Sequence, residues 1–322
     1  MPNRNPLLNS ISIVTIILAL VLVCSTSANI SPAAHATQQQ QYSMVGKWGS
    51  GGSGFGKFSQ PLDVVVDPSG NVYVTSFTGL ANQIQKFTNN RTFITSWGQL
   101  GFGNGLFTNP AGLAIDPSGN IYVSDFGNAQ NGIQKFTNNG TFITSWGSTG
   151  LGEGQFINPS GITVDPSGNV YVGDFGENNR IQKFDSNGGF ITKWGTPGTG
   201  NGQFINPSDI ATDKSGNVYA VDSGNNRIQK FDSNGKFITK WGTTGSVDGQ
   251  LSGPIGISID SSGNIYVSDN GNNRIQKFDS NGKFITKWSV NSPFGVAVDP
   301  NDKVYVIDQN DASVEIYSST SP

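Results

Sequence analysis

Two aspartates occupy positions at which the other repeats of this chain carry glycine. Asp63 and Asp209 each follow a proline by two residues. The matched positions of the four remaining repeats hold Gly112, Gly161, Gly256 and Gly295. Because calcium prefers carboxylate oxygens as ligands, the pair predicts a calcium or ordered-water site if both side chains face one channel. A structural alternation between Gly and Asp is the competing interpretation.

Five more aspartates share a second matched position, at the end of a strand-like segment. They are Asp125, Asp174, Asp222, Asp269 and Asp308, and the first repeat has Ser76 instead. Three of these aspartates have an arginine downstream in the same repeat, which predicts structural ion pairs. The predicted pairs are Asp174 with Arg180, Asp222 with Arg227, and Asp269 with Arg274.

The other two aspartates of this set lack an arginine partner. Gly132 stands where the partner of Asp125 would be. Ser313 takes the same place for Asp308, so both carboxylates are predicted to be available for a cation or a polar ligand. The candidate ligand-binding residues are therefore Ser76, Asp125, Phe126 and Asp308.

The remaining titratable residues indicate structure rather than catalysis. Six aspartates end a first strand-like segment, where a carboxylate that accepts backbone N–H groups forms a turn. They are Asp67, Asp116, Asp165, Asp213, Asp260 and Asp299. The only histidine, His35, precedes the repeats, so no imidazole base or histidine zinc site is predicted within them. Cys24 is the only cysteine, which excludes a disulfide within the chain.

An internal repeat determines which elements must position these residues. The six tryptophans follow one another at spacings of 49, 49, 48, 47 and 47 residues, at Trp48, Trp97, Trp146, Trp194, Trp241 and Trp288. Each unit holds four short segments rich in aromatic and β-branched residues, joined by Gly, Asn, Asp, Ser and Pro. This pattern is typical of a β-propeller blade. In the fourth unit, the predicted strands are 207–213, 217–222, 227–231 and 237–241.

The two ends of the chain predict how the ring closes. The last unit offers strands at 294–299, 303–308 and 314–317, and it lacks a fourth. The segment from Met44 to Trp48 matches the missing strand, because its Lys-Trp-Gly sequence recurs at 193–195. We therefore predict an all-β, six-bladed β-propeller with four antiparallel strands per blade, whose last blade is closed by the N-terminal strand.

Each unit carries a common motif in several parts. A Pro-x-Gly or Pro-x-Asp sequence opens an apolar strand that ends in Asp, followed by Ser-Gly-Asn-Val-Tyr-Val, a further Asp and Asn-Asn-Arg-Ile-Gln-Lys-Phe. In the fifth unit the last part includes Asp269, Asn272, Asn273 and Arg274. The chain resembles the NHL-repeat family over about residues 44–317. Family members include RNA-binding and protein-binding propellers, and six-bladed relatives include lyases and lactonases, so the resemblance implies the fold and no single activity.

Long and variable loops join the second strand to the third, and the fourth to the next unit. They include 77–83, 99–109, 126–132, 148–158 and 243–253. Strand direction places these loops on one rim, where the binding residues of a rigid scaffold usually gather. We expect a noncatalytic binding or scaffold propeller that recognises a protein or glycan partner on this rim. The alternative is a calcium-assisted lyase or hydrolase.

The net charge and the N-terminus bear on partners and location. A net charge of −3 is not the strongly basic balance expected of a nucleic-acid-binding protein. Residues 1–36 resemble a signal peptide with a small-x-small site before Thr37, so we expect a secreted protein with a tether over 37–43 and the propeller over 44–322. A membrane anchor over 7–24, with the propeller outside, is the alternative. Asn29, Asn90 and Asn139 lie in glycosylation sequons.

Overall fold

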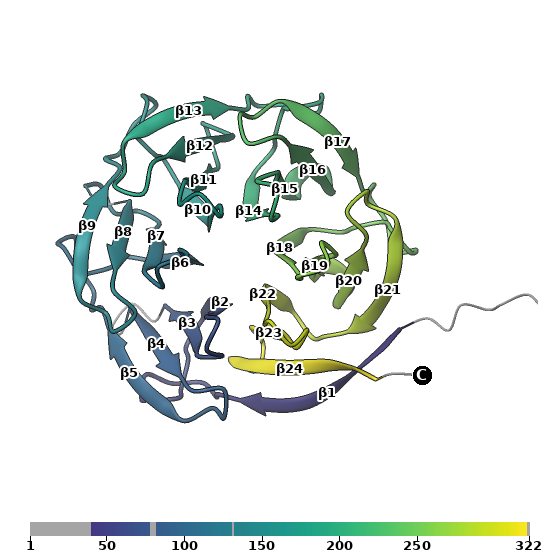
Figure 1. Cartoon of the computed structure of the whole chain (residues 1–322), viewed down its shortest axis with the longest axis horizontal. Helices are drawn as coiled ribbons and strands as arrows, with labels where there is room; N and C mark the ends of the chain where they lie inside the picture. Colours follow the sequence, from purple (N-terminus) through teal and green to yellow (C-terminus); the bar gives the residue numbers. More distant parts are fainter. Residues whose placement is uncertain (1–39, 78–81, 131, 321–322) are drawn as a thin grey trace, which may run out of the picture. The chain divides into compact units, whose positions relative to one another are not determined.

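The computed structural model describes residues 40–77, 82–130 and 132–320, and these form six four-stranded sheets around a central axis (Figure 1). Neighbouring strands within each sheet pair antiparallel. Five sheets are contiguous in sequence, and the sixth combines three C-terminal strands with the N-terminal strand β1. The predicted six-bladed propeller with N-terminal closure is therefore confirmed.

The strands follow the repeat closely. Blade 1 comprises β2 (Pro61–Val66), β3 (Val72–Ser76), β4 (Gln83–Phe87) and β5 (Phe93–Trp97), and blade 2 comprises β6 (Pro110–Ile115), β7 (Ile121–Asp125), β8 (Ile133–Phe136) and β9 (Phe142–Trp146). Blade 3 comprises β10 (Pro159–Val164), β11 (Val170–Asp174), β12 (Arg180–Phe184) and β13 (Phe190–Trp194), and blade 4 comprises β14 (Pro207–Thr212), β15 (Val218–Asp222), β16 (Arg227–Phe231) and β17 (Phe237–Trp241). Blade 5 comprises β18 (Pro254–Ile259), β19 (Ile265–Asp269), β20 (Arg274–Phe278) and β21 (Phe284–Ser289), and blade 6 comprises β22 (Pro293–Val298), β23 (Val304–Asp308), β24 (Ser313–Thr320) and β1 (Gln41–Trp48). Two short 3-10 turns, Ser223–Asn225 and Asn270–Asn272, follow β15 and β19.

The second strand of each blade is buried on both faces, because each sheet packs between two neighbouring sheets. All five residues of β15 are buried, whereas the outer strand β17 alternates between half-buried and exposed residues. The apolar core is accordingly divided among the blade interfaces. One cluster, for example, joins Val221 of blade 4 to Ile257 and Val267 of blade 5.

A tyrosine on the second strand organises each interface. In blade 1, the Tyr73 hydroxyl donates a hydrogen bond to Asp67 at 3.1 Å. The Lys86 ammonium lies 5.1 Å from the centre of the Tyr73 ring and donates to the Asn138 carbonyl of blade 2 at 3.0 Å. Asp67 also accepts the backbone N–H of Ser69 at 2.9 Å. In every blade, the matched aspartate accepts the backbone N–H of the residue two positions later in the chain. This confirms the predicted turn-forming role of Asp67, Asp116, Asp165, Asp213, Asp260 and Asp299.

A glycine in the turn between the third and fourth strands packs against the tryptophan of the preceding blade. A Cβ atom on Gly140, whose φ is 85°, would lie 2.6 Å from the Trp97 ring. The matched residue of blade 1 is Arg91, which adopts the same left-handed conformation with a φ of 69°.

We expect Arg91→Gly to raise the free energy of unfolding by about 1 kcal/mol. The left-handed conformation costs a side-chain-bearing residue roughly 1–2 kcal/mol, and the greater freedom of glycine in the unfolded chain offsets part of that gain. Urea denaturation measures the change. Gly140→Ala is the control and should destabilise, and an unchanged or lower midpoint for Arg91→Gly would contradict the expectation.

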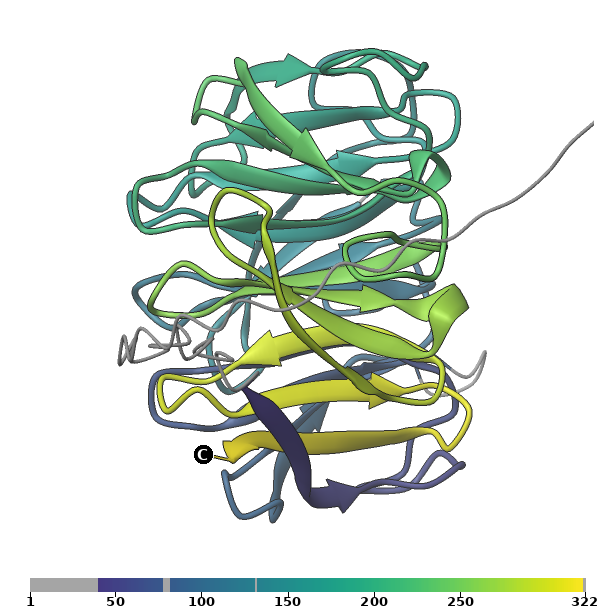
Figure 2. The same cartoon turned by 90° about the vertical axis from the view of Figure 1, so that its right-hand side faces the viewer.

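The ring closes through a longer pairing than the sequence predicts. Residues 44–48 pair with 314–317 as expected, and the ladder continues to Gln41 opposite Thr320. Tyr42 then stacks on Trp288 with ring centres 4.1 Å apart and contacts the Tyr266 hydroxyl at 2.9 Å. Figure 2 shows β1 next to the C-terminal strand β24, with which it pairs at this seam. The N-terminal strand thus contacts blade 5 as well as blade 6.

Most predictions for the N-terminus fall outside the described residues. The signal peptide over 1–36, the alternative anchor over 7–24 and the Asn29 sequon all lie there. The predicted tether over 37–43 is wrong for residues 41–43, because they belong to β1. Among the described residues, no helix is long and apolar enough to cross a membrane. Asn90 and Asn139 are exposed at turns.

Candidate functional site

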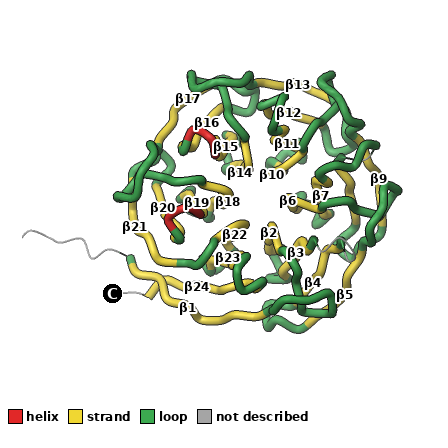
Figure 3. Tube along the Cα trace, turned by 180° about the vertical axis from the view of Figure 1, so that it is seen from behind, coloured by secondary structure: helices red, strands yellow, loops and turns green. Residues whose placement is uncertain are grey.

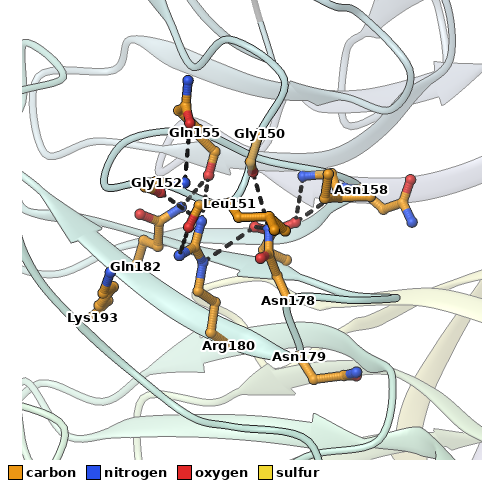
Figure 4. A network of polar contacts seen from close by, with 12 residues as sticks. Gly150, Leu151, Gly152, Gln155, Asn158, Asn178, Asn179, Arg180, Gln182 and Lys193 are labelled. Atoms are coloured by element: carbon orange, nitrogen blue, oxygen red, sulfur yellow. Dashed lines mark hydrogen bonds and ion pairs between the residues drawn. The ribbon is translucent and has the colours of Figure 1, made fainter.

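The three predicted ion pairs at the strand ends are confirmed, and their arginines also donate hydrogen bonds to the crossover loops. In blade 3, the Arg180 guanidinium contacts Asp174 at 3.4 Å and donates to the carbonyls of Leu151, Gly152 and Gln155 (Figure 4). The matched pairs of blades 4 and 5 are closer, with Nε to Oδ2 distances of 2.7 Å. These arginines fasten each crossover loop to its blade, so the three aspartates have a structural role.

Asp125 does not lack partners, and the prediction that it is available for a ligand is wrong. Its buried carboxylate accepts the backbone N–H groups of Thr108 and Asn109, at 2.9 and 2.7 Å, and the side-chain amide of Asn128 at 2.8 Å. Burial raises the pKa of Asp125, while these hydrogen bonds act in the opposite direction. Polar groups of nearby loops therefore replace the arginine found in blades 3 to 5.

Asp308 is also partnered, by a residue from the other end of the chain. Lys47 of β1 lies 3.7 Å from Asp308 and contacts Asp311 at 2.6 Å and Glu315 at 3.0 Å. The prediction of an unpaired carboxylate is wrong here too. Ser76 is buried, and its hydroxyl accepts the N–H of Ser59 at 3.3 Å.

Phe126, the fourth predicted residue, lies at the mouth of the central channel. It lines a cavity of about 520 Å³, which we call the mouth cavity. The cavity is bounded by Gln60, Leu62, Phe77, Asn109, Ala111, Phe126, Pro159, Ser160, Phe175 and Phe294. The rings of Phe126 and Phe175 are parallel within 3°, with centres 5.6 Å apart. Phe77, Phe126 and Phe175 together line one side of the mouth cavity, which we call the aromatic wall.

The repeat explains how the aromatic wall forms. Phe77, Phe126 and Phe175 each follow the second strand of a blade, and their N–H groups donate to the carbonyls of residues 60, 109 and 158. These bonds hold each phenylalanine beside the first strand of its blade. Blades 4, 5 and 6 carry Ser223, Asn270 and Gln309 at the same position. The rim is thus aromatic over three consecutive blades and polar over the other three.

Two smaller cavities continue the mouth cavity along the channel. The upper one, of about 140 Å³, shares Leu62, Ala111, Ser160 and Phe294 with the mouth cavity. The lower one, of about 230 Å³, is lined by the first strands of all six blades, which surround the axis in Figure 3. Asp63 and Asp209 line both smaller cavities, so the pair lies at their junction. We call it the channel pair.

Backbone N–H groups hold the channel pair in place. Each first strand has a register irregularity after its opening proline, as between Pro61 and Val64. Asp63 accepts the N–H groups of Val64 and, from the next blade, Leu113, both at 2.8 Å. Asp209 makes the equivalent bonds to Ile210 and Ile257, at 2.8 and 2.9 Å. Each aspartate therefore links its own blade to the following one.

The channel environment disfavours two charged carboxylates. Both side chains are half-buried because they face the cavities, yet protein surrounds them. Desolvation raises the pKa of Asp63 to about 7, against the two hydrogen bonds that lower it. Desolvation and the charge of Asp63 raise the pKa of Asp209 well above its ordinary range. Near neutral pH the channel pair therefore does not carry its full charge of two carboxylates.

The glycines matched to the channel pair are not exchangeable with aspartate. A Cβ atom on Gly295 would lie 2.7 Å from the Asp63 Cα atom, and one on Gly112 would lie 2.6 Å from the Ser160 carbonyl oxygen. Cβ atoms on Gly161 and Gly256 would also collide with backbone atoms of the next blade. The two aspartates thus occupy the two positions of this layer where a side chain fits.

The channel pair alone supplies fewer oxygen ligands than calcium needs. Calcium takes six to eight oxygen ligands, whereas the channel pair offers four carboxylate oxygens, each of which already accepts one backbone N–H. Among residues 40–77, 82–130 and 132–320, no group of three or more His, Cys, Asp or Glu side chains could hold a metal ion. The calcium site remains a prediction.

These features define the class of the molecule as a six-bladed β-propeller with a ligand-sized cavity at one mouth of its channel. The NHL repeat model matches residues 107–130, 156–184, 204–231 and 251–278. The six-bladed propeller therefore contains four NHL repeats, as the resemblance predicts. A sequence comparison with curated proteins finds no match.

Solved structures share the fold at low sequence identity. A streptogramin B lyase is similar with a TM-score of 0.61 and 15% identity, covering 88% of this chain and 98% of that one. A Bacteroides thetaiotaomicron protein of unknown function has a TM-score of 0.65 and 14% identity, covering 87% and 76%. A chain of a nidogen/laminin complex has a TM-score of 0.56 and 18% identity, covering 74% and 84%. At such identities the likeness concerns the fold alone.

Proposed function

We propose that this protein is an exported, noncatalytic binding propeller that takes an apolar group of its ligand into the mouth cavity. The aromatic wall of that cavity is the observation that carries the proposal. Its volume of about 520 Å³ falls within the range of roughly 300–1,000 Å³ usual for ligand sites. Because Phe77, Phe126 and Phe175 stay half-buried, a ligand that covers them gains apolar contact area.

A protein or a glycan partner can supply such a group. An aromatic side chain stacks on phenylalanine rings, and a sugar ring offers an apolar C–H face of similar size. The surrounding long loops add adaptable contacts on the same rim. The apolar run near the N-terminus supports export. The likeness to a lyase is one of fold, so we make no second proposal.

Phe126→Ala should weaken ligand binding by about tenfold. The substitution removes half of the stacked pair with Phe175, and a tenfold loss corresponds to about 1.4 kcal/mol, the range expected for an aromatic contact. Phenylbutanol is a suitable neutral probe, and isothermal titration calorimetry measures its affinity.

Asn187→Ala is the matched control, because Asn187 is exposed in a turn on the opposite rim. It should leave the affinity unchanged. Equal losses for the two variants, or none for Phe126→Ala, would refute the placement of the site. Thermal unfolding of each variant checks that the propeller remains folded.

A further inference from the structure

The mouth cavity leads to a pair of acids. Leu62, Ala111, Ser160 and Phe294 line both the mouth cavity and the upper channel cavity, and the latter reaches the channel pair. The mouth cavity and the upper channel cavity are therefore adjacent, and Asp63 and Asp209 line the upper channel cavity.

The depth of the channel pair follows from the strand register. The Phe77 N–H donates to the Gln60 carbonyl, so this part of the wall is level with residue 60. Because of the register irregularity in β2, Asp63 lies beside Thr75 of β3, whose hydroxyl accepts the Asp63 N–H at 2.8 Å. Thr75 is two residues from Phe77, so at about 3.3 Å per residue the acid is roughly 7 Å below the wall. That span suits an extended alkyl chain between a ring and a terminal polar group.

The channel pair has no cation of its own. Each buried aspartate at positions 174, 222 and 269 contacts an arginine. Among the described residues that line the two channel cavities, Asp63 and Asp209 are the ionisable ones. Four backbone N–H groups donate to these carboxylates, which leaves further lone pairs on the carboxylate oxygens. No cationic side chain among these lining residues therefore neutralises an ionised Asp63 or Asp209, and a cationic ligand can do so.

We propose that the ligand group is a cationic amphiphile: an apolar or aromatic body in the mouth cavity, joined by an alkyl chain to a primary ammonium that binds Asp63 and Asp209. This inference rests on the proposed function of the mouth cavity. An ammonium is compact and has three N–H donors, so it can pair with a carboxylate here without the six or more oxygens that calcium needs. The glycines at 112, 161, 256 and 295 place no side chains in the upper channel cavity, which they line.

Binding has a defined proton balance. The free protein holds a proton on the channel pair near neutral pH, because desolvation favours the neutral carboxyl. An incoming ammonium keeps its own proton and stabilises the ionised pair, so the proton of the pair is released to solvent. The affinity for amines should therefore rise as the pH increases through about 7, the pKa of Asp63.

Matched probes separate this inference from the proposed function. We would titrate phenylalkylamines of increasing chain length and the phenylalkanols of the same lengths into the protein by calorimetry. At the best length, the amine should bind about tenfold or more tightly than the alcohol, a difference of at least about 1.4 kcal/mol. Titration in buffers of different ionisation enthalpy should show proton release with the amine alone.

Asp63→Asn and Asp209→Asn should each remove most of the amine advantage and leave alcohol binding unchanged. Phe126→Ala should weaken both probes. If amines and alcohols bind equally, or if the Asn variants keep the amine advantage, the inference is overturned while the proposed function stands. If neither probe responds to Phe126→Ala, the proposed function fails instead. Thermal unfolding confirms that each variant is folded. If Asp63→Asn does not fold, Asp209→Asn provides a second test.

Discussion

A protein that lacks residues 40–48 should lose the cooperative unfolding transition of the closed propeller. The truncation removes β1 and exposes the backbone edge of β24. It also removes Lys47, which leaves Asp308 and Glu315 buried without their cation. Removing one partner of a fully buried ion pair costs about 3–5 kcal/mol, and the loss here is smaller because the Lys47 side chain is 34% exposed. Together with the lost β1–β24 ladder, it is a large share of the roughly 5–15 kcal/mol total stability of a typical domain.

The experiment compares chains that begin at residues 39 and 49 by urea and thermal unfolding. The shorter chain should unfold at a much lower midpoint or without a cooperative transition. A synthetic peptide of residues 40–48 should restore the transition in trans, since an extended peptide can add a strand to an open sheet edge. Equal midpoints for the two chains would show that β1 does not hold the ring.

Contacts within and between successive units explain why the fold could be predicted from sequence. The strand patterns and the six turn-forming aspartates lie within single repeats, and the tryptophan spacing relates each repeat to the next. Even the closing strand was predictable, because Lys47 and Trp48 repeat a local motif. The extension to Gln41 was not predictable, because it depends on the stack of Tyr42 on Trp288, for which the other described repeats have no equivalent. Turn glycines cover Trp97, Trp146, Trp194 and Trp241 instead, and Arg91 holds the matched turn position of blade 1.

The candidate ligand residues were harder to predict, because their partners lie outside the repeat pattern. Lys47 reaches Asp308 from the opposite end of the sequence. Asp125 is satisfied by Thr108, Asn109 and Asn128, whose positions depend on loop conformation. A missing arginine was therefore an insufficient reason to expect a free carboxylate.

The aromatic wall was only partly identified from sequence, although its signal was present. Phe77 and Phe175 stand at the same position as Phe126, directly after the second strand, and the other three units have polar residues there. Comparing that single column across the six units would have found the wall. The cavity itself required the structure, because Leu62 and Phe294 come from different blades.

The free energy of unfolding of the wild-type protein should decrease as the pH rises from about 4 to about 7, because of the channel pair. The folded-state pKa of Asp63 is raised to about 7, and that of Asp209 is raised as well. In this window the folded protein therefore binds protons that the unfolded chain has released. The pair's contribution to the free energy of unfolding is fully present below the pKa of aspartate in the unfolded chain, near 4. It is lost as the pH rises through the pKa values of the folded state. Each net proton contributes up to about 1.4 kcal/mol per pH unit.

The double variant Asp63→Asn, Asp209→Asn isolates this effect. Its neutral amides do not titrate, whereas the raised pKa values of Asp125, Asp174 and Asp308 are common to both proteins and cancel in the difference. At pH 4 the variant should be less stable, because an amide cannot accept both backbone N–H groups that a carboxyl group serves, at a cost of about 1–3 kcal/mol. Its relative stability should then improve as the pH rises, and urea denaturation at several pH values measures the difference. Parallel pH profiles for the two proteins would mean that the pair is hydrated and has ordinary pKa values, and the proton release expected on amine binding would then not occur.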